Sequence, residues 1–304
     1  MSILSITNIK KSFGENLVLD DINLSIAEND FYGLVGKNGA GKTTLINIIA
    51  GINKPDKGSI VFYDQKNVET IKKRIGLMPD SEGLYKNITG YEFLKYMGKL
   101  KKINLSDVQI TDLLEKVYLE APKSLTIKNY SFGMKKKLAI AQTLIGSPEL
   151  LILDEPTSGV DPESAVYLRQ LFKNIHNEGK TILITSHNLS EIEKLCNKVS
   201  LLDKGKFIVS GELSSILKRG TNNKKLVINF KAPYSDDEIM NILQNIPFRI
   251  KATLTEKKLE IDYAHSNINN ILEILLKIKD FQILNISTRK ADLEELFFLR
   301  NMDS

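Results

Sequence analysis

The chain has 304 residues, enough for one large domain or two of ordinary size, and its composition, 42% hydrophobic and 26% charged, is that of a soluble globular protein. No window approaches the roughly 18 consecutive apolar residues of a membrane-spanning helix, and the N-terminal stretch "MSILSITNIKKS" lacks the apolar core of a secretory signal. The net charge is +5, and the lysines are spread along the chain without aromatic residues between them, so we expect no nucleic-acid binding. The single cysteine, Cys196, excludes an intrachain disulfide.

The first 30 residues alternate in polarity, which predicts an antiparallel edge sheet. The apolar run "FYGLVG" (31–36) and the periodic "KTTLINIIAG" (42–51) predict a strand, a turn and a helix. Further continuous apolar or β-branched runs predict strands of a parallel sheet that is covered on both faces; they are "LLIL" (150–153), "TILIT" (181–185) and "KVSLL" (198–202). Between about 85 and 148 helical periodicity dominates, so we expect a helical insertion in an α/β domain.

The character of the chain changes after Gly211, and "GTNNKK" (220–225) is typical of a linker. The remainder predicts strands at 225–231, 248–255, 258–264 and 281–288, and helices at 235–246, 267–278 and 291–301. The order βαββαβ with a final helix indicates a small ferredoxin-like α+β domain. We therefore expect two domains, 1–219 and 225–304.

The stretch "GKNGAGKT" (36–43) fits G-x-x-x-x-G-K-[ST] and lies between a predicted strand and helix, as that phosphate-binding motif requires. Backbone N–H groups of such a loop and of the helix that follows attract phosphate oxygens. Lys42 is predicted to reach the β- and γ-phosphates, and the Thr43 hydroxyl to hold Mg²⁺. The alternative is a glycine-rich turn without a ligand. The predicted nucleotide-binding residues here are Gly36, Lys37, Asn38, Gly39, Ala40, Gly41, Lys42, Thr43 and Thr44.

Two carboxylates and a histidine follow predicted strands. Asp154 ends the run "LLIL", at the sheet edge where open α/β sheets bind ligands, and is placed to hold Mg²⁺. Glu155 comes next and is predicted to polarise the attacking water. His187 closes "TILITSH" and could donate a hydrogen bond to a γ-phosphate. Taken alone, each of these residues is more often a turn, cap or surface residue.

Together, "GKNGAGKTT", "YSFGMKKKLAIAQTLIGSPELLILDEPTSGVDP" and "TSH" resemble the nucleotide-binding subunit of an ATP-binding cassette (ABC) transporter over about residues 3–220. The resemblance implies a P-loop ATPase core with a helical subdomain. It also implies a head-to-tail dimer with ATP at the interface, and it makes Glu155, His187 and Lys42 the catalytic residues.

Other roles come from the resemblance alone. Ser131 and Gly133, with Phe132 and Met134, form the signature at a helix start and act on the γ-phosphate of ATP held by the partner subunit. Phe13 corresponds to the aromatic residue that stacks on adenine. The dimer loop that crosses the interface is "SGVD", with Ser158, Gly159 and Asp161.

The chain departs from the common family pattern at two places. The signature reads Tyr130-Ser131-Phe132-Gly133-Met134 where LSGGQ is usual, and such forms are familiar among ABC-2-type exporters of antibiotics, lantibiotics, polysaccharides or sodium. Asp80 takes the place of a glutamine that contacts Mg²⁺ and senses the permease; we expect Asp80 to reach the metal.

We therefore expect an ATP- and Mg²⁺-dependent ATPase subunit that powers export through a separate permease. Its partners would be that permease, docked near residues 80–96, and a second ATPase subunit, identical or paralogous. It would lie at the cytoplasmic face of the cell membrane. The alternatives are a soluble ABC ATPase acting on ribosomes or DNA, and a regulatory nucleotide-binding module that hydrolyses ATP poorly.

Overall fold

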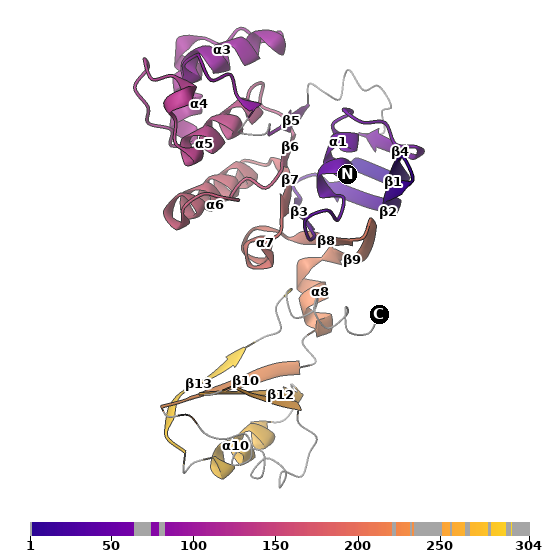
Figure 1. Cartoon of the computed structure of the whole chain (residues 1–304), viewed down its shortest axis with the longest axis vertical. Helices are drawn as coiled ribbons and strands as arrows, with labels where there is room; N and C mark the ends of the chain where they lie inside the picture. The colour runs from indigo at the N-terminus through magenta and orange to yellow at the C-terminus, as the bar shows by residue number, and fades with distance from the viewer. Residues whose placement is uncertain are drawn as a thin grey trace. The chain divides into compact units, whose positions relative to one another are not determined.

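The computed structural model describes residues 2–63, 74–78, 83–220, 223–231, 233, 251–255, 257–264, 268–278, 281–289 and 293. The chain forms two compact units, Met1–Leu213 and Ser214–Ser304 (Figure 1). The domain limits 1–219 and 225–304 stay a prediction. Within the described residues, no helix is both long and apolar enough to cross a membrane.

A six-stranded sheet in the order β5-β6-β7-β3-β8-β9 forms the centre of the first unit. Neighbouring strands run parallel from β5 to β8, and β9 is antiparallel to β8. Every residue of β3, β6 and β7 is buried, which confirms the predicted strands covered on both faces. The strands are β3 (Phe31–Val35), β5 (Ile75–Leu77), β6 (Leu150–Leu153), β7 (Thr181–Ser186), β8 (Lys198–Asp203) and β9 (Lys206–Glu212).

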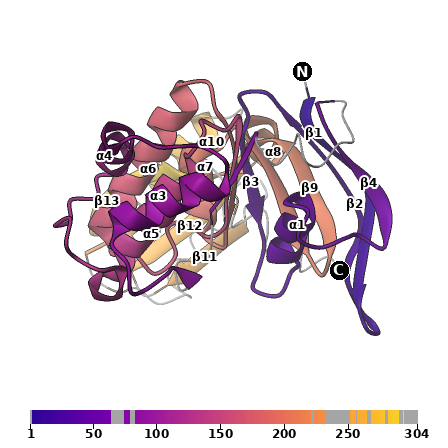
Figure 2. The same ribbon diagram turned by 90° about the horizontal axis from the view of Figure 1, so that it is seen from above.

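A second, antiparallel sheet in the order β2-β1-β4 confirms the predicted edge sheet. Its strands are β1 (Ser2–Phe13), β2 (Asn16–Ala27) and β4 (Lys57–Phe62). Helix α1 (Lys42–Ile49) lies between this sheet and the central one, and its apolar residues join one core with both (Figure 2). The N-terminus of α1 is therefore fixed in place by two sheets.

The opposite face of the central sheet is covered by α7 (Leu189–Leu195). Tyr32 and Leu34 belong to the core around α1, whereas Gly33 lies against Ile192 and Cys196 at α7. This alternation along β3 places α1 and α7 on opposite faces. Helix α6 (Pro162–Asn177) begins as predicted, with Asp161 as its N-cap and Pro162 in its first turn.

The predicted helical insertion is confirmed. It contains α3 (Gly90–Leu100), α4 (Asp107–Lys116), a 3₁₀ turn (Ile127–Asn129) and α5 (Phe132–Thr143), grouped beside β5 (Figure 1). Both α3 and α4 begin with a capping box, formed by Thr89 with Glu92 and by Ser106 with Gln109.

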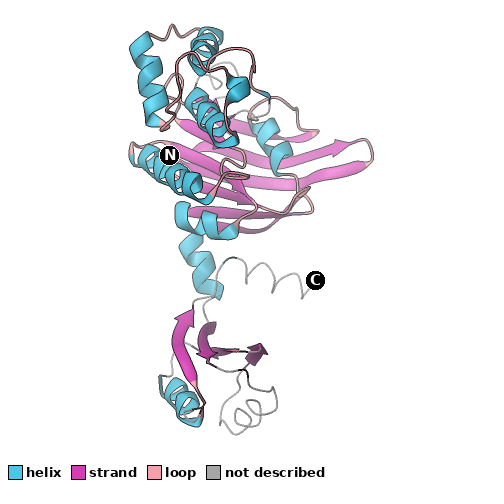
Figure 3. Cartoon of the chain, turned by 60° about the vertical axis from the view of Figure 1, so that its left-hand side comes forward, coloured by secondary structure: helices cyan, strands magenta, loops and turns pink. Residues whose placement is uncertain are grey.

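The second unit begins with α8 (Leu213–Gly220) and contains a four-stranded antiparallel sheet in the order β11-β12-β10-β13. Ile228 and Ile261 of the sheet and Ile274 and Ile278 beside it are fully buried, as expected where α10 packs on the sheet (Figure 3). The predicted helices 235–246 and 291–301 lie outside the described residues apart from Leu293, so the ferredoxin-like assignment stays a prediction. The elements are β10 (Asn223–Phe230), β11 (Lys251–Thr255), β12 (Lys258–Ala264), α10 (Ile268–Lys277) and β13 (Ile283–Arg289).

Gly76 of β5 lies so close to the end of α5 that an added Cβ would be 2.3 Å from the Thr143 carbonyl oxygen. We expect Gly76→Ala to lower the free energy of unfolding by about 1–3 kcal/mol, because backbone must move to make room. Denaturant unfolding measures this loss. Gly83→Ala is the control, since its Cβ would meet nothing within 4 Å. Equal losses in the two variants would contradict the close contact.

Candidate functional site

Three neighbouring strands end at the same edge of the central sheet. The register pairs Leu153 of β6 with Ile184 of β7, and Val35 of β3 with Ser186 of β7. The segments that follow these strands, 36–43, 154–161 and 187–188, therefore meet at one place. This is the carboxyl edge, where open α/β sheets bind their ligands.

The loop 36–41 adopts a path that requires glycine at two points. A Cβ on Gly36 would lie 2.4 Å from the Leu202 carbonyl oxygen of β8, so no larger residue fits where the loop leaves β3. Gly41 has φ +109° and is the N-cap of α1, and among the described residues no side chain caps this helix. The first N–H groups of α1 thus remain available to an anion.

A cavity of about 430 Å³ opens beside this helix start. Most of the predicted loop residues line it, together with Glu155, Ser158 and His187. Val18 of β2 was not predicted; no motif marks it, because its place depends on β2 lying against the loop. Phe13 is half exposed at the end of β1, and the described lining does not include it. The lining residues are Val18, Lys37, Asn38, Gly39, Gly41, Lys42, Thr43, Thr44, Glu155, Ser158 and His187.

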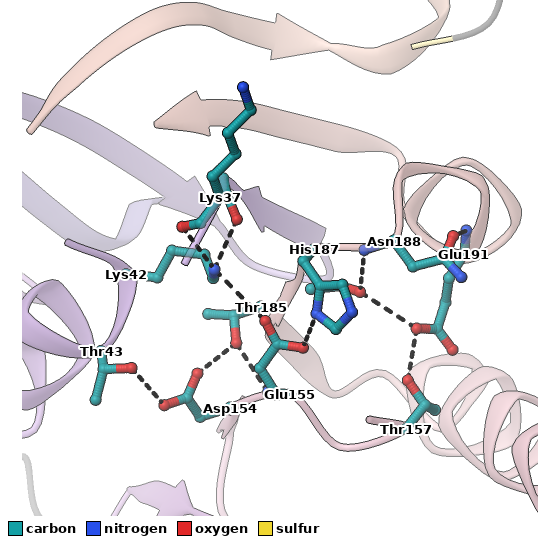
Figure 4. A network of polar contacts seen from close by, with 12 residues as sticks. Lys37, Lys42, Thr43, Asp154, Glu155, Thr157, Thr185, His187, Asn188 and Glu191 are labelled. Carbon is teal, nitrogen blue, oxygen red and sulfur yellow. Dashed lines mark hydrogen bonds and ion pairs between the residues drawn. The ribbon is translucent and has the colours of Figure 1, made fainter. Parts of the chain in front are cut away.

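Lys42 is buried, and its ammonium group is anchored by oxygen atoms. Its Nζ donates to the Gly36 carbonyl at 2.7 Å and to the Lys37 carbonyl at 3.4 Å, and lies 3.5 Å from Glu155 Oε1 (Figure 4). A buried charge needs such partners. The Lys42 ammonium group is thereby held at the wall of the cavity, beside the Glu155 carboxylate.

Asp154 accepts hydrogen bonds from two threonines, one on each side. Thr43 Oγ1 donates to Oδ2 at 3.2 Å, and Thr185 Oγ1 donates to Oδ1 at 2.5 Å. The hydroxyl of Thr43 and the carboxylate of Asp154 are hard oxygen ligands of the kind that Mg²⁺ prefers. No cluster of three or more His, Cys, Asp or Glu side chains forms a metal site in the described part of the chain. Asp80, predicted to reach the metal, lies outside the described residues.

Glu155 has an unusual backbone and a fully engaged carboxylate. Its φ is +47°, in the left-handed region, which costs a non-glycine residue about 1–2 kcal/mol. Its N–H donates to Thr185 Oγ1 at 2.8 Å, so one hydroxyl joins Glu155 to Asp154. The carboxylate contacts Lys42 through Oε1, and Oε2 lies 2.8 Å from His187 Nδ1. Glu155 and His187 are thus brought together as predicted residues of one site.

A third carboxylate, that of the buried Glu191 in α7, supports the loop after β6. It accepts from Thr157 Oγ1 at 2.5 Å and from Ser186 Oγ at 3.4 Å (Figure 4). It thereby joins the end of β7 to the segment that follows Glu155. Sequence analysis missed Glu191 and Thr185, because a glutamate on a short helix and a threonine in a strand carry no motif of their own.

The predicted signature and dimer loop lie beside each other at the starts of α5 and α6. Ser131 caps α5 by accepting from the Met134 N–H at 3.2 Å. The Phe132 ring covers Gly159, where an added Cβ would lie 2.9 Å from the ring. Asp161 accepts from the Ser164 N–H at 2.9 Å, which lowers the pKa of its carboxyl. Apart from Ser158, the described lining of the chain's own cavity includes none of these residues.

Comparison with known proteins agrees with this geometry. A family model described as "ABC transporter" matches residues 19–158. The lantibiotic transport ATP-binding protein SrtF of Streptococcus pyogenes is 39% identical over 210 residues, which are 69% of this chain and 91% of the relative. The bacitracin transport ATP-binding protein BcrA of Bacillus licheniformis is 32% identical over 300 residues, 97% of this chain and 96% of the relative. The second of these matches extends through both units.

Solved structures show the same fold. The structure of an ATP-binding subunit of an ABC transporter matches with a TM-score of 0.64 and 27% identity, over 71% of this chain and 92% of that one. A dimeric ATP-binding cassette in a post-hydrolysis state, bound to ADP and Pi, also gives a TM-score of 0.64. It is 24% identical and covers 69% of this chain and 98% of that one, so it supports the fold alone.

Thr185→Val removes the hydroxyl that joins Asp154 to Glu155 at nearly constant volume. We expect the free energy of unfolding to fall by about 1–3 kcal/mol, because buried polar groups lose their hydrogen-bond partner. We also expect slower ATP turnover. Thr181→Val is the matched control: it lies on the same strand, and its hydroxyl accepts the Asn29 N–H at 2.9 Å away from the cavity. Calorimetry measures the stability of the two variants and phosphate release measures their ATP turnover. Equal turnover in the two variants would contradict a role for the Thr185 hydroxyl in the site.

Proposed function

This chain belongs to the family of ABC transporter ATPases, and on that premise we propose that it powers export through a separate membrane-spanning permease. The observation that carries the proposal is the meeting of Lys42, the Thr43–Asp154 pair and the Glu155–His187 pair at the open start of α1. The relatives SrtF and BcrA are named for lantibiotic and bacitracin transport, which supports the exporter branch.

ATP would bind with its phosphates at the loop 36–41 and the first turn of α1. Lys42 would neutralise the β- and γ-phosphates, and the exposed Phe13 ring would stack on adenine. Thr43 and Asp154 would hold Mg²⁺, which supplies positive charge to the phosphate oxygens. Asp80 is proposed to complete that shell. The other nucleotide-binding residues proposed here are Gly36, Lys37, Asn38, Gly39, Ala40, Gly41 and Thr44.

Glu155 would act as the base that accepts a proton from the attacking water. The contact of His187 with Glu155 Oε2 orients this carboxylate, and Lys42 holds Oε1. The left-handed backbone of Glu155 turns its carboxylate toward the cavity that it lines. Hydrolysis would then depend on how these side chains position the water and neutralise charge on the phosphates, with no covalent intermediate on the protein.

A second ATPase subunit, identical or paralogous, would complete each site. Ser131, Phe132, Gly133 and Met134 form a helix start outside the chain's own cavity, which suits an anion held by another subunit. Ser158, Gly159 and Asp161 would cross the interface between the two subunits. ATP binding would join the subunits, and hydrolysis would release them.

The permease would dock on the helical insertion. Tyr85 and Tyr96 present exposed rings whose centroids lie 5.6 Å apart, edge to face, and form an apolar surface for a cytoplasmic helix of the permease. This contact would hold the ATPase at the cytoplasmic face of the membrane.

Glu155→Gln should bind Mg-ATP but hydrolyse it roughly 10²–10⁴-fold more slowly, because the base is lost while the phosphate site remains. Phosphate release measures turnover, and size-exclusion chromatography with ATP should show an accumulated dimer. The same variant, tagged and purified from solubilised membranes, should bring down a multi-span membrane protein. Glu163→Gln, in the exposed first turn of α6, is the control. Wild-type turnover in Glu155→Gln would exclude Glu155 as the base.

Ser131→Arg should abolish dimer-dependent hydrolysis while each subunit still binds nucleotide, because arginine blocks the signature helix start. Ser106→Arg is the matched control: Ser106 caps α4 in the same way, so its loss costs about 1 kcal/mol of stability but should leave turnover intact. Fluorescent nucleotide binding and phosphate release are the readouts. Loss of nucleotide binding in Ser131→Arg would contradict action on the partner's ATP.

A further inference from the structure

We propose that Lys136 is a positioning residue for Glu155, so that the signature helix and the glutamate of the same chain act as one unit. Lys136 lies in the second turn of α5, five residues after Ser131, and only 7% of its surface is exposed. Its Nζ donates to the Glu155 carbonyl oxygen at 2.7 Å. This inference rests on the proposed function, in which Glu155 is the base.

The backbone of Glu155 is fixed by contacts on both sides. Thr185 of β7 takes the Glu155 N–H, whereas the carbonyl accepts from Lys136 and, at 3.2 Å, from the Ser158 N–H. The left-handed φ of +47° persists only where the surroundings impose it. Lys136 therefore adds a constraint from a helix of the insertion to those from β7 and from the loop itself.

A second contact of α5 reaches the same loop. Phe132 lies one turn before Lys136, its ring centroid is 5.5 Å from the Lys136 Nζ, and the ring covers Gly159. The first two turns of α5 thus contact the segment 155–159 at both ends. A displacement of the signature turn is transmitted to the peptide that sets the direction of the Glu155 carboxylate.

The neighbouring lysine provides a contrast within the run "KKK". Lys137 Nζ donates to the Tyr118 carbonyl at 3.0 Å, in the segment that follows α4. Lys137 is half-buried, while Lys136 is buried. Both residues make a lysine–carbonyl hydrogen bond from the same helix, but only that of Lys136 ends on Glu155.

Lys136→Met removes the ammonium group and keeps the length of the side chain. We expect kcat for ATP hydrolysis to fall roughly 10–100-fold, as for a displaced catalytic group, with KM and ATP affinity within about twofold of wild type. Lys136→Arg should restore much of the rate, and Lys137→Met should leave kcat unchanged. If Lys136→Met does not fold, Lys136→Gln, too short to reach the carbonyl, should show the same loss. Wild-type kcat in a folded Met or Gln variant, or equal loss in Lys137→Met, would overturn the proposal.

Mixed dimers of two tagged forms test whether Lys136 acts within its own chain. The first dimer carries Lys136→Met and Glu155→Gln in one subunit beside an unchanged partner; the second carries one substitution in each subunit. Action within the chain predicts that the first dimer matches a dimer with Glu155→Gln in one subunit and no other change. The second dimer should fall to about half the rate of the Lys136→Met homodimer, because it keeps one slowed site where that homodimer has two. The reverse pattern would overturn the positioning role. A wild type that neither dimerises nor hydrolyses ATP would instead refute the proposed function.

Discussion

One hydroxyl group determines the geometry on which the site depends. Thr185 is fully buried in β7, donates to Asp154 and accepts from the Glu155 N–H. Because β6 and β7 are locked in parallel register, this bridge fixes where β6 ends and how the chain turns at Glu155. Two adjacent carboxylates with different partners result, one directed at Thr43 and the other at Lys42 and His187.

The surrounding charges follow from that turn. Lys42 is anchored to the carbonyls of its own loop as well as to Glu155, so its ammonium stays at the cavity wall in a buried setting. The buried Glu191 accepts hydrogen bonds from Thr157 and Ser186 and so connects the loop after β6 to the end of β7. The site is thus a set of loops held by three strands, β3, β6 and β7, and by α1 and α7, and such rigid elements commonly provide positional precision.

Sequence patterns predicted the central strands, the edge sheet and the helical insertion, because continuous apolar runs, alternation and helical periodicity each have a local cause. The glycine loop was predicted from its phosphate-binding motif between a strand and a helix. Asp154, Glu155 and His187 were predicted from their places after strands together with that motif and the resemblance to ABC ATPases. Thr185, Glu191 and Val18 were not, since their roles depend on strand register and loop packing that no local pattern encodes. Lys136 carries no sequence signal that sets it apart from Lys137; burial in the folded chain distinguishes the two.

The contact between Phe132 and Gly159 couples the signature to the dimer loop within one chain. An aromatic ring occupies the place where the common signature has glycine, and it fills the space that a side chain at 159 would need. Gly159 also has φ +73°, which disfavours most other residues. A larger residue at 159 would therefore have to displace the Phe132 ring and also adopt a left-handed backbone, so the two positions are sterically coupled.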